Sequence, residues 1–397
     1  MTRPRVIFVN RVYWPSEEAT AQLLTDLAEG LAGGGWPVDV IAAGDGGGER
    51  NGVRLHRTGP GDRHAGLLSR IANYRRFTRA AAAQVAALAR RGDIVVPLTD
   101  PPMLGAAVAS AAAARGARVV PWVQDIYPEI VSAHLGALLS LPLLPLRRRR
   151  DAAWRAAARV VVLGTDMARQ VAARGVPAGR IAVVPNWAPR ELDAPASPAA
   201  IAARRQAWGL PGGFVVAYSG NLGRVHEFAT VLDAAALLRD RPDLTFLFIG
   251  RGARFEQIRA AAARQRLGNV RLLPPEPRAQ LAAALAAADV HLVTLRPAFA
   301  RLVYPSKLAG VLAAGRPVAF VGPTDGDIAR LLADGPCGVA VAPGEAGPLA
   351  AALRRWRDAP DLARAAGERG RRAYERQLTF ARALARWTAV LEEAARS

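Results

Sequence analysis

The sequence contains little of several residue types that mark whole classes of protein. Its 397 residues include a single cysteine, Cys337, which excludes an internal disulfide framework and a thiolate zinc cluster and fits a reducing compartment. Aromatic residues make up only 6% of the chain and are not interleaved with its arginine runs, which argues against binding nucleic acid by base stacking. No run reaches about 18 uninterrupted apolar residues, so we expect no membrane-spanning helix. The chain also enters the strand-like run Val6–Val9 almost at once, so we expect no signal peptide and a cytoplasmic protein.

Hydrophobic residues, by contrast, are plentiful at 51%, and the chain is long enough for two domains with large cores. Apolar runs alternate with alanine-rich helical stretches, a pattern typical of parallel sheets covered on both faces. The predicted strands cover residues 6–9, 38–42, 94–97, 119–123, 160–163 and 181–184, then 214–218, 245–249, 270–273, 290–294, 318–321 and 339–341.

A proline-rich break near residue 190 separates these two series of strands. We therefore expect an α/β fold of two doubly wound, Rossmann-like domains, residues 1–190 and 191–375. The remaining residues, 376–397, predict a helix that could cross back to the first domain through Trp387 and Leu391.

The charge balance is strongly basic, with 53 basic and 33 acidic residues and a net charge of +20. Residues 54–91 hold nine arginines and one acid, and residues 147–159 hold six arginines and one acid. Three explanations stay open: a solvated arginine-rich surface, an anionic membrane or lipid phosphate, and nucleic acid, which is the least favoured.

Lysine is almost absent, because Lys307 is the only one and every other basic residue is arginine. A compact ammonium is not interchangeable with a planar guanidinium where space around a phosphate is tight. Lys307 falls in the first turn of a helix predicted to enter at Pro305 and Ser306 and to stop at Gly315. A cation is unfavourable there unless an anion occupies the site. The sequence therefore predicts phosphate binding at Ser306 and Lys307, although one lysine must fall somewhere by chance.

Two glycine-rich segments follow predicted strands of the second domain. Because glycine lets the backbone approach a ligand closely, and arginine can reach diphosphate oxygens, both segments are candidates for an anion cradle with Lys307. The candidate residues are Gly220, Asn221, Gly223, Arg224 and Arg251. Each segment taken alone is also typical of a simple connection. His226 could bond a sugar or phosphate, or be a surface histidine at a helix start.

In the first domain, Asp125 and Glu129 follow the predicted strand 119–123, at the edge where α/β proteins bind ligands. A carboxylate there could orient or deprotonate an acceptor hydroxyl. Alternatively, Asp125 caps the helix that follows. The loop after the first strand, with Asn10, Tyr13 and Trp14, is expected to line the same acceptor cleft.

The apolar stretch Leu135–Leu146 is too short to span a bilayer and continues into Arg147, Arg148, Arg149 and Arg150, with Trp154 one turn further on. An apolar segment beside a cationic cluster and a tryptophan suits the interface of an anionic membrane. The alternative is a buried helix with an arginine-rich exit.

Six motifs together resemble the retaining glycosyltransferase family 4, and more narrowly its bacterial branch of colanic acid and capsule enzymes of the WcaI type. They are Asn10–Pro15, Val123–Glu129, Pro185–Trp187, Tyr218–Gly223, Pro305–Lys307 and Ala314–Val318. The resemblance covers nearly the whole chain. It implies a GT-B fold, in which two domains face each other across a cleft. It also implies a nucleotide-diphosphate sugar held by the second domain, an acceptor held by the first, and no metal or other cofactor.

The chain departs from the family at two positions. Many members carry two glutamates flanking the helix that begins at the Pro-Ser-Lys motif, and the second typically holds the nucleotide ribose. Those positions are Leu302 and Gly310 here, and neither side chain can accept a hydrogen bond. Either other groups make the donor contacts, or the protein has lost activity.

These observations predict a glycosyltransferase that acts in surface polysaccharide biosynthesis on a saccharide or lipid-linked acceptor, peripherally at the inner face of the membrane. Two alternatives stay open: a non-catalytic basic protein that binds polyanions or nucleic acid, and a nucleotide-sugar epimerase on the same fold. An epimerase would need an acid and a base near the sugar, and the sequence around Leu302 and Gly310 supplies neither.

Overall fold

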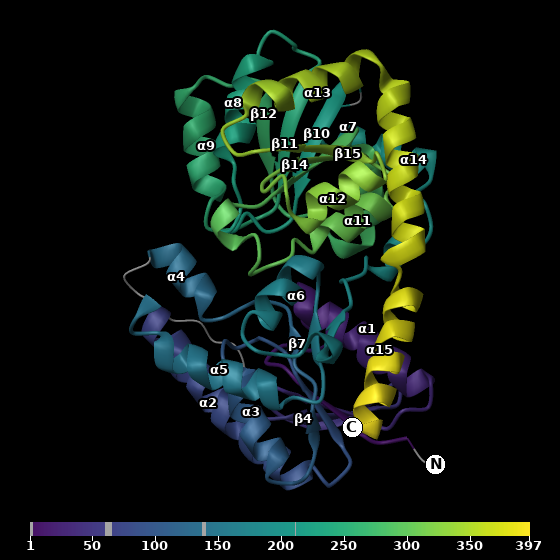
Figure 1. Cartoon of the computed structure of the whole chain (residues 1–397). Coiled ribbons are helices and arrows are strands. Elements are labelled where there is room, and N and C mark those ends of the chain that lie inside the picture. The colour runs from purple at the N-terminus through teal and green to yellow at the C-terminus, as the bar shows by residue number, and fades with distance from the viewer. Residues whose placement is uncertain (1–2, 60–65, 137–139, 211) are drawn as a thin grey trace. The chain divides into compact units, whose positions relative to one another are not determined.

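The computed structural model describes residues 3–59, 66–136, 140–210 and 212–397. The chain forms two compact units, in which α/β layers are plainly visible (Figure 1). Unit 1 consists of Met1–Asn186, Arg301–Tyr304 and Phe380–Ser397, and unit 2 consists of Trp187–Ala300 and Pro305–Thr379.

Unit 1 contains two sheets. The larger has the order β3-β4-β2-β1-β5-β6 and is parallel except for the β3–β4 pair, and the smaller is the parallel sheet β7-β8-β9. The strands are β1 (Val6–Val9), β2 (Val38–Ala42), β3 (Gly47–Arg50), β4 (Val53–Arg57), β5 (Ile94–Pro97), β6 (Arg118–Val119), β7 (Trp122–Val123), β8 (Val160–Val162) and β9 (Ile181–Val183). The α-helices are α1 (Ala19–Gly33), α2 (Gly66–Leu88), α3 (Leu104–Ala113), α4 (Glu129–Leu135), α5 (Leu144–Ala156), α6 (Thr165–Ala172) and α15 (Phe380–Arg396).

Unit 2 contains one parallel sheet with the order β12-β11-β10-β13-β14-β15. Its strands are β10 (Phe214–Ser219), β11 (Leu244–Ile249), β12 (Val270–Leu273), β13 (Val290–Thr294), β14 (Val318–Val321) and β15 (Gly338–Val341). Its α-helices are α7 (Pro198–Ala207), α8 (Ala229–Leu237), α9 (Phe255–Arg264), α10 (Leu281–Ala287), α11 (Lys307–Ala313), α12 (Asp327–Asp334), α13 (Ala346–Asp358) and α14 (Pro360–Gln377). Strands β10, β13 and β14 are mostly apolar and almost fully buried, as expected for a sheet covered on both faces.

The C-terminal helix α15 is part of unit 1. Its Trp387 is fully buried, with its ring centroid 5.0 Å from that of Trp122 and 6.5 Å from that of Phe8, in edge-on arrangements. Aromatic pairs of this geometry contribute about 0.5–1.5 kcal/mol beyond the area that they bury. Trp387 therefore anchors the end of the chain against β1 and β7.

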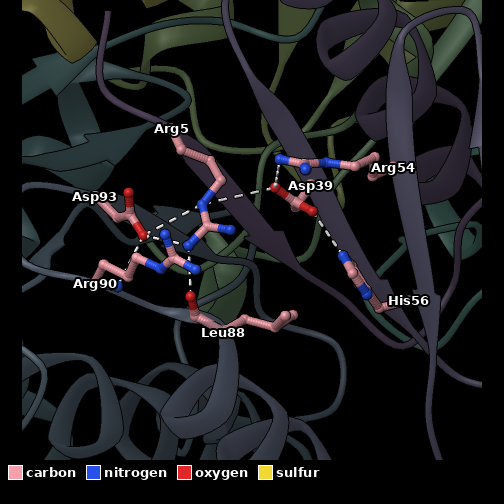
Figure 2. Close-up of polar contacts among 7 residues, drawn as sticks. All are labelled: Arg5, Asp39, Arg54, His56, Leu88, Arg90 and Asp93. Atoms are coloured by element: carbon pink, nitrogen blue, oxygen red, sulfur yellow. Dashed lines mark hydrogen bonds and ion pairs between the residues drawn. The ribbon is translucent and has the colours of Figure 1, made fainter.

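A polar network in unit 1 accounts for part of its excess of arginine (Figure 2). The buried carboxylate of Asp39 lies 3.7 Å from Arg5, 3.0 Å from Arg54 and 2.6 Å from Nε2 of His56. Arg5 also donates to Asp93 over 2.6 Å. Arginines in such pairs serve the fold, so the basic character of residues 54–91 is only partly available to a partner.

The structure corrects two expectations about the strands. The predicted strand 119–123 is interrupted at Pro121, and its halves, β6 and β7, belong to different sheets. Strands β3 and β4 were not predicted, because Gly47–Arg50 carries no apolar residue and Val53–Arg57 alternates apolar and basic residues at the sheet edge.

Candidate functional site

The first candidate site lies at the centre of the unit 2 sheet. Strands β10 and β13 are neighbours although three helices and two strands separate them in sequence, which makes their junction a topological switch point. Ligands of doubly wound folds bind outside the carboxyl ends of the strands at such a point. The loops after β10 and β13 are joined there, since the backbone N–H of Arg296 donates to Val225 over 2.9 Å.

The two glycine-rich segments predicted to approach a ligand are packed against each other. The backbone N–H of Leu222 donates to the carbonyl of Arg251 over 2.9 Å. A Cβ at Gly252 would lie 2.6 Å from the carbonyl oxygen of Leu222, and one at Gly250 would overlap the carbonyl oxygen of Gly220. Only glycine allows this approach, which brings the ends of β10 and β11 together.

Lys307 begins α11 beside these loops, and its amino group has no acidic partner among the described residues. Its Nζ donates to Oη of Tyr218 over 2.6 Å, lies 3.3 Å from Nε2 of His226, and sits 4.1 Å above the Tyr218 ring. A Cβ at Gly220 would lie 3.4 Å from Cε of Lys307, so its stem has little spare room. Burial lowers the pKa of Lys307 to about 7. Across the described ranges, no carboxylate forms an ion pair with it.

His226 is a buried residue of this cluster, which corrects the expectation of a surface histidine at a helix start. Its Nδ1 lies 2.7 Å from the carbonyl oxygen of Thr294, and its Nε2 faces Lys307. Burial, followed by the charge of Lys307, lowers the pKa of His226 to about 3, so the ring is neutral. Because Thr294 offers only an acceptor, Nδ1 carries the proton and Nε2 is left to accept.

Further cations lie near His226, the neighbour of Lys307. Burial lowers the pKa of Arg254, and the positive charges of Arg296 and Arg224 lower it further. The negative charge of Glu227 acts to raise this pKa. Like charges that gather with so little acidic compensation mark a place where an anion would be stabilised.

The sequence did not predict Arg254 and Arg296, and the signal available was their position just after strands β11 and β13. Ser306, Asn221, Arg224 and Arg251 are exposed at the rim.

The two positions where the family pattern has glutamates lie in apolar surroundings here. Leu302 belongs to unit 1, where its carbonyl accepts from the backbone N–H of Ile126 over 2.8 Å and its side chain is buried. Gly310 is buried, and a Cβ there would lie 3.4 Å from Leu192 and 3.5 Å from Leu285. A carboxylate at position 310 would meet apolar side chains.

The second candidate site lies in unit 1 around Asp125. Residue 125 pairs with Val303 in an isolated antiparallel bridge, and its carboxylate has no hydrogen bond or ion pair in the part of the chain that the structure describes. Burial, and then the charge of Asp100, raises the pKa of Asp125 to about 6. The capping alternative is wrong, because α4 begins at Glu129 after Pro128, without a side-chain cap. An unpaired carboxylate with a raised pKa is a candidate for proton transfer.

Sequence reasoning missed the neighbours of Asp125. Arg11, which follows β1, donates from Nε to Asp100 over 3.0 Å, and Asp100 follows β5. The Arg11 guanidinium lies 5.5 Å from the ring centroid of Tyr74 on α2. Strands β1 and β5 form the switch point of the larger sheet, so this group occupies the position in unit 1 where a ligand is expected.

Of the three residues expected to line the acceptor cleft, only Trp14 is exposed, at 42%. Its ring stacks with Arg50 at 4.4 Å. Asn10 and Tyr13 are fully buried, yet in the described part of the chain Oδ1 of Asn10 and Oη of Tyr13 have no hydrogen-bond partner. Burial raises the pKa of Tyr13 to about 12, so its phenol stays neutral. These two side chains support the loop rather than an open surface.

Glu129 lies in an ion-pair network that does not favour a catalytic role. Its two carboxylate oxygens lie 2.6 and 2.8 Å from the Arg150 guanidinium, and Arg147 and Arg174 lie 3.2 and 3.3 Å away. Burial acts to raise the pKa of Glu129, but the hydrogen bonds and charge of Arg150, with Arg147, outweigh it and hold this pKa below its ordinary value. A carboxylate held in this way is a poor base.

Glu129→Ala is therefore expected to lower the free energy of unfolding by about 1–3 kcal/mol, because the buried Arg150 guanidinium loses its bidentate partner and keeps its ion pair with Asp151. The activity of the folded fraction should change little. Urea unfolding followed by circular dichroism measures the first quantity. A large loss of activity without a loss of stability would instead place Glu129 in the catalytic machinery.

The ion pairs of Glu129 split the cluster Arg147–Arg150 into two arginines that contact Glu129 and two that do not. Arg150 is buried, stacks on the buried Trp154 at 4.2 Å and pairs with Glu129, so neither Arg150 nor Trp154 can contact a membrane as expected. Arg147 is also turned toward Glu129. Arg148 and Arg149 are exposed.

Comparisons with known proteins identify both units. Residues 19–187 match the glycosyl transferase 4-like domain, and residues 213–358 match the glycosyl transferases group 1. Both matched models describe glycosyltransferase domains, and together they take in most of the chain. Anabaena HepE, solved in complex with UDP and glucose, has the same fold, with a TM-score of 0.75 over 98% of this chain and 100% of that chain at 18% identity. The predicted fold of two Rossmann-like domains is thereby confirmed.

Two curated glycosyltransferases share sequence with the chain. It is 30% identical over 253 residues to the probable glycosyltransferase WbjE of Pseudomonas aeruginosa. This aligned stretch covers 62% of this chain and 61% of the relative. It is 31% identical over 157 residues to the putative colanic acid biosynthesis glycosyl transferase WcaI of Escherichia coli K12, covering 39% of this chain and 38% of the relative. The matched stretch thus spans less than two thirds of each relative.

Proposed function

We propose that this protein is a retaining hexosyltransferase that moves a sugar from a nucleotide-diphosphate sugar to a polyprenyl-diphosphate-linked glycan in the synthesis of a surface polysaccharide. In this proposal no metal or other cofactor takes part. The bond between the sugar C1 and the diphosphate breaks, the acceptor oxygen bonds to C1, and the hydroxyl proton goes to a carboxylate of unit 1.

The observation that carries the proposal is the unpaired Lys307 at the switch point of unit 2. Its neighbour His226 lies near Arg254, which in turn interacts with Arg224, Arg296 and one acid, Glu227. A diphosphate supplies the negative charge that this group lacks. The complexes of HepE with UDP and with UDP-glucose support a nucleotide sugar as the donor.

Asp125 is the residue we assign to the acceptor hydroxyl. Its carboxylate is half-buried and, within the described residues, unpaired, whereas Glu129 is held by three arginines. A carboxylate with a pKa of about 6 is ionised at neutral pH and can still accept a proton as the new bond forms. The names of the relatives support a polysaccharide product, such as colanic acid for WcaI.

Screening of nucleotide sugars by mass spectrometry tests the proposal. A panel of UDP-, GDP-, ADP- and dTDP-sugars is offered with and without polyprenyl-diphosphate-linked saccharides. We expect one donor to be consumed only with an acceptor, whose mass rises by one hexose. Conversion of the donor sugar without any acceptor would favour an epimerase instead.

We also propose that unit 1 binds an anionic membrane surface. Leu141 and Leu146 are 78% and 40% exposed and flank the turn into α5, which carries the exposed Arg148 and Arg149. On α2, Leu68 and Ile71 are likewise exposed. Helix α3 packs against both α2 and α5 (Figure 1). None of the helices in the described ranges has the length and apolar character that a bilayer crossing requires.

Replacing both Arg148 and Arg149 by serine is expected to weaken binding to phosphatidylglycerol vesicles about 30-fold, because each arginine near an anionic leaflet contributes about 1 kcal/mol. Co-sedimentation at 0.1 M salt measures the affinity, and 1 M salt should abolish it. The matched control replaces Arg264 and Arg372, two exposed arginines of unit 2. Equal losses in both double variants would mean that net charge, and not this surface, governs binding.

A further inference from the structure

Lys307 is held by two neutral side chains, and each has a defined hydrogen-bonding role. Oη of Tyr218 donates to the carbonyl oxygen of Asn221 over 2.9 Å, so it accepts from Nζ of Lys307 through its lone pair. Nε2 of His226 also faces Nζ as an acceptor, because Nδ1 faces the carbonyl of Thr294. Both acceptors orient Nζ, yet neither supplies a negative charge.

We propose that Tyr218 and His226 are positioning residues that orient Nζ of Lys307 in a donor site that supplies it with no negative charge, so that a nucleoside diphosphate binds together with one proton. The inference rests on the proposed function of this site. The proton comes from the solvent and is taken up by Nζ, which becomes an ammonium ion paired with the diphosphate.

Of Lys307 and its two contacts, Tyr218 and His226, only Lys307 has a pKa near neutral pH. Burial raises the pKa of Tyr218 well above its ordinary value, and the pKa of His226 is lowered to about 3, so both stay neutral. Arg254 interacts with Arg224, Arg296 and Glu227, and its charge adds to the lowering of the pKa of His226. Burial disfavours a positive charge on Lys307 until an anion arrives.

The direction of the pH effect follows from this arrangement. With a pKa of about 7 in the empty site, Lys307 is mostly uncharged at pH 8. A bound diphosphate raises this pKa because it favours the charged form. The affinity for the diphosphate therefore falls as the pH rises above 7, by up to tenfold per pH unit, until the pKa of the occupied site is reached. Below about pH 6 Lys307 is already charged and the effect disappears.

Isothermal titration calorimetry at pH 8 in HEPES and in Tris tests the inference, because these buffers differ in their enthalpies of ionisation. The probe is the tightest binder among UDP, GDP, ADP and dTDP, whose phosphates are fully ionised at this pH. We expect binding enthalpies that differ between the buffers by the uptake of about one proton. Equal enthalpies would overturn the inference. Failure of all four diphosphates to bind at any pH would instead overturn the proposed function.

Two variants of His226 separate positioning from a structural role. His226→Asn can keep the bond to Thr294 but loses the acceptor at Nε2, whereas His226→Gln can present an oxygen to Lys307. We expect the asparagine variant to bind the diphosphate 3- to 10-fold more weakly and to shift its proton uptake to lower pH, and the glutamine variant to restore both. Tyr218→Phe, which keeps the ring, should shift the uptake in the same direction. Weaker binding with an unchanged pH dependence would mean that these side chains only support the fold.

Discussion

Lys307→Ala is expected to weaken the binding of a nucleoside diphosphate about 10- to 100-fold. A hydrogen bond between a charged donor and a phosphate contributes about 1.5–3 kcal/mol, and no other lysine can replace this one. Calorimetry gives the affinity. The free energy of unfolding should change by less than about 1 kcal/mol, because within the described residues Lys307 has no ion pair to lose.

Two further variants sharpen this test. Lys307→Arg should also bind poorly, since the lysine stem lies against Gly220 and the Tyr218 ring, and a guanidinium needs more width. Arg264→Ala removes one exposed positive charge from the same unit and should bind normally. Normal binding by Lys307→Ala would contradict the site assignment.

Asp125→Asn is expected to reduce turnover by about 10²–10⁴-fold, because a positioned base contributes a factor of this size. The structure excludes the capping role, so the fold should not suffer. Since burial raises the pKa of Asp125, ionisation of this carboxyl opposes folding above its ordinary pKa, and the neutral asparagine should be at least as stable at pH 7. Turnover and urea unfolding measure the two quantities.

The pH profile gives this prediction a second readout. A base must be ionised, so the turnover of the wild type should fall as the pH drops below about 6, while the residual turnover of Asp125→Asn should not follow that limb. Glu17→Gln, which removes an exposed carboxylate of the same unit, should behave like the wild type. Full activity of Asp125→Asn would show that another group handles the acceptor proton.

Most of the strands that the sequence predicted are apolar runs. Val6–Val9 and Val318–Val321 are continuously apolar and buried, as is typical of parallel sheets covered on both faces. The edge strand β3 and its neighbour β4 could not be found in this way, because β3 has only polar residues and glycine and β4 alternates apolar and basic residues. The break at Pro121 could have been suspected, since proline cannot donate to a sheet ladder.

The candidate site was predictable where composition made one residue stand out. Lys307 is conspicuous as the only lysine, but Arg254 and Arg296 are two among 52 arginines and are defined only by their place after a strand. The ion-pair network of Glu129 was not predicted for a related reason. Its partners Arg147, Arg150 and Arg174 lie 18 to 45 residues further along the chain, and only the fold brings them to its carboxylate.

A crystal structure of the protein with its tightest-binding nucleoside diphosphate tests the central assignment most directly. We predict a diphosphate oxygen within about 3 Å of Nζ of Lys307, between the loops that follow β10 and β13, with Arg254 or Arg296 turned toward the phosphates. A diphosphate bound elsewhere, with Lys307 still directed only at Tyr218 and His226, would contradict this account.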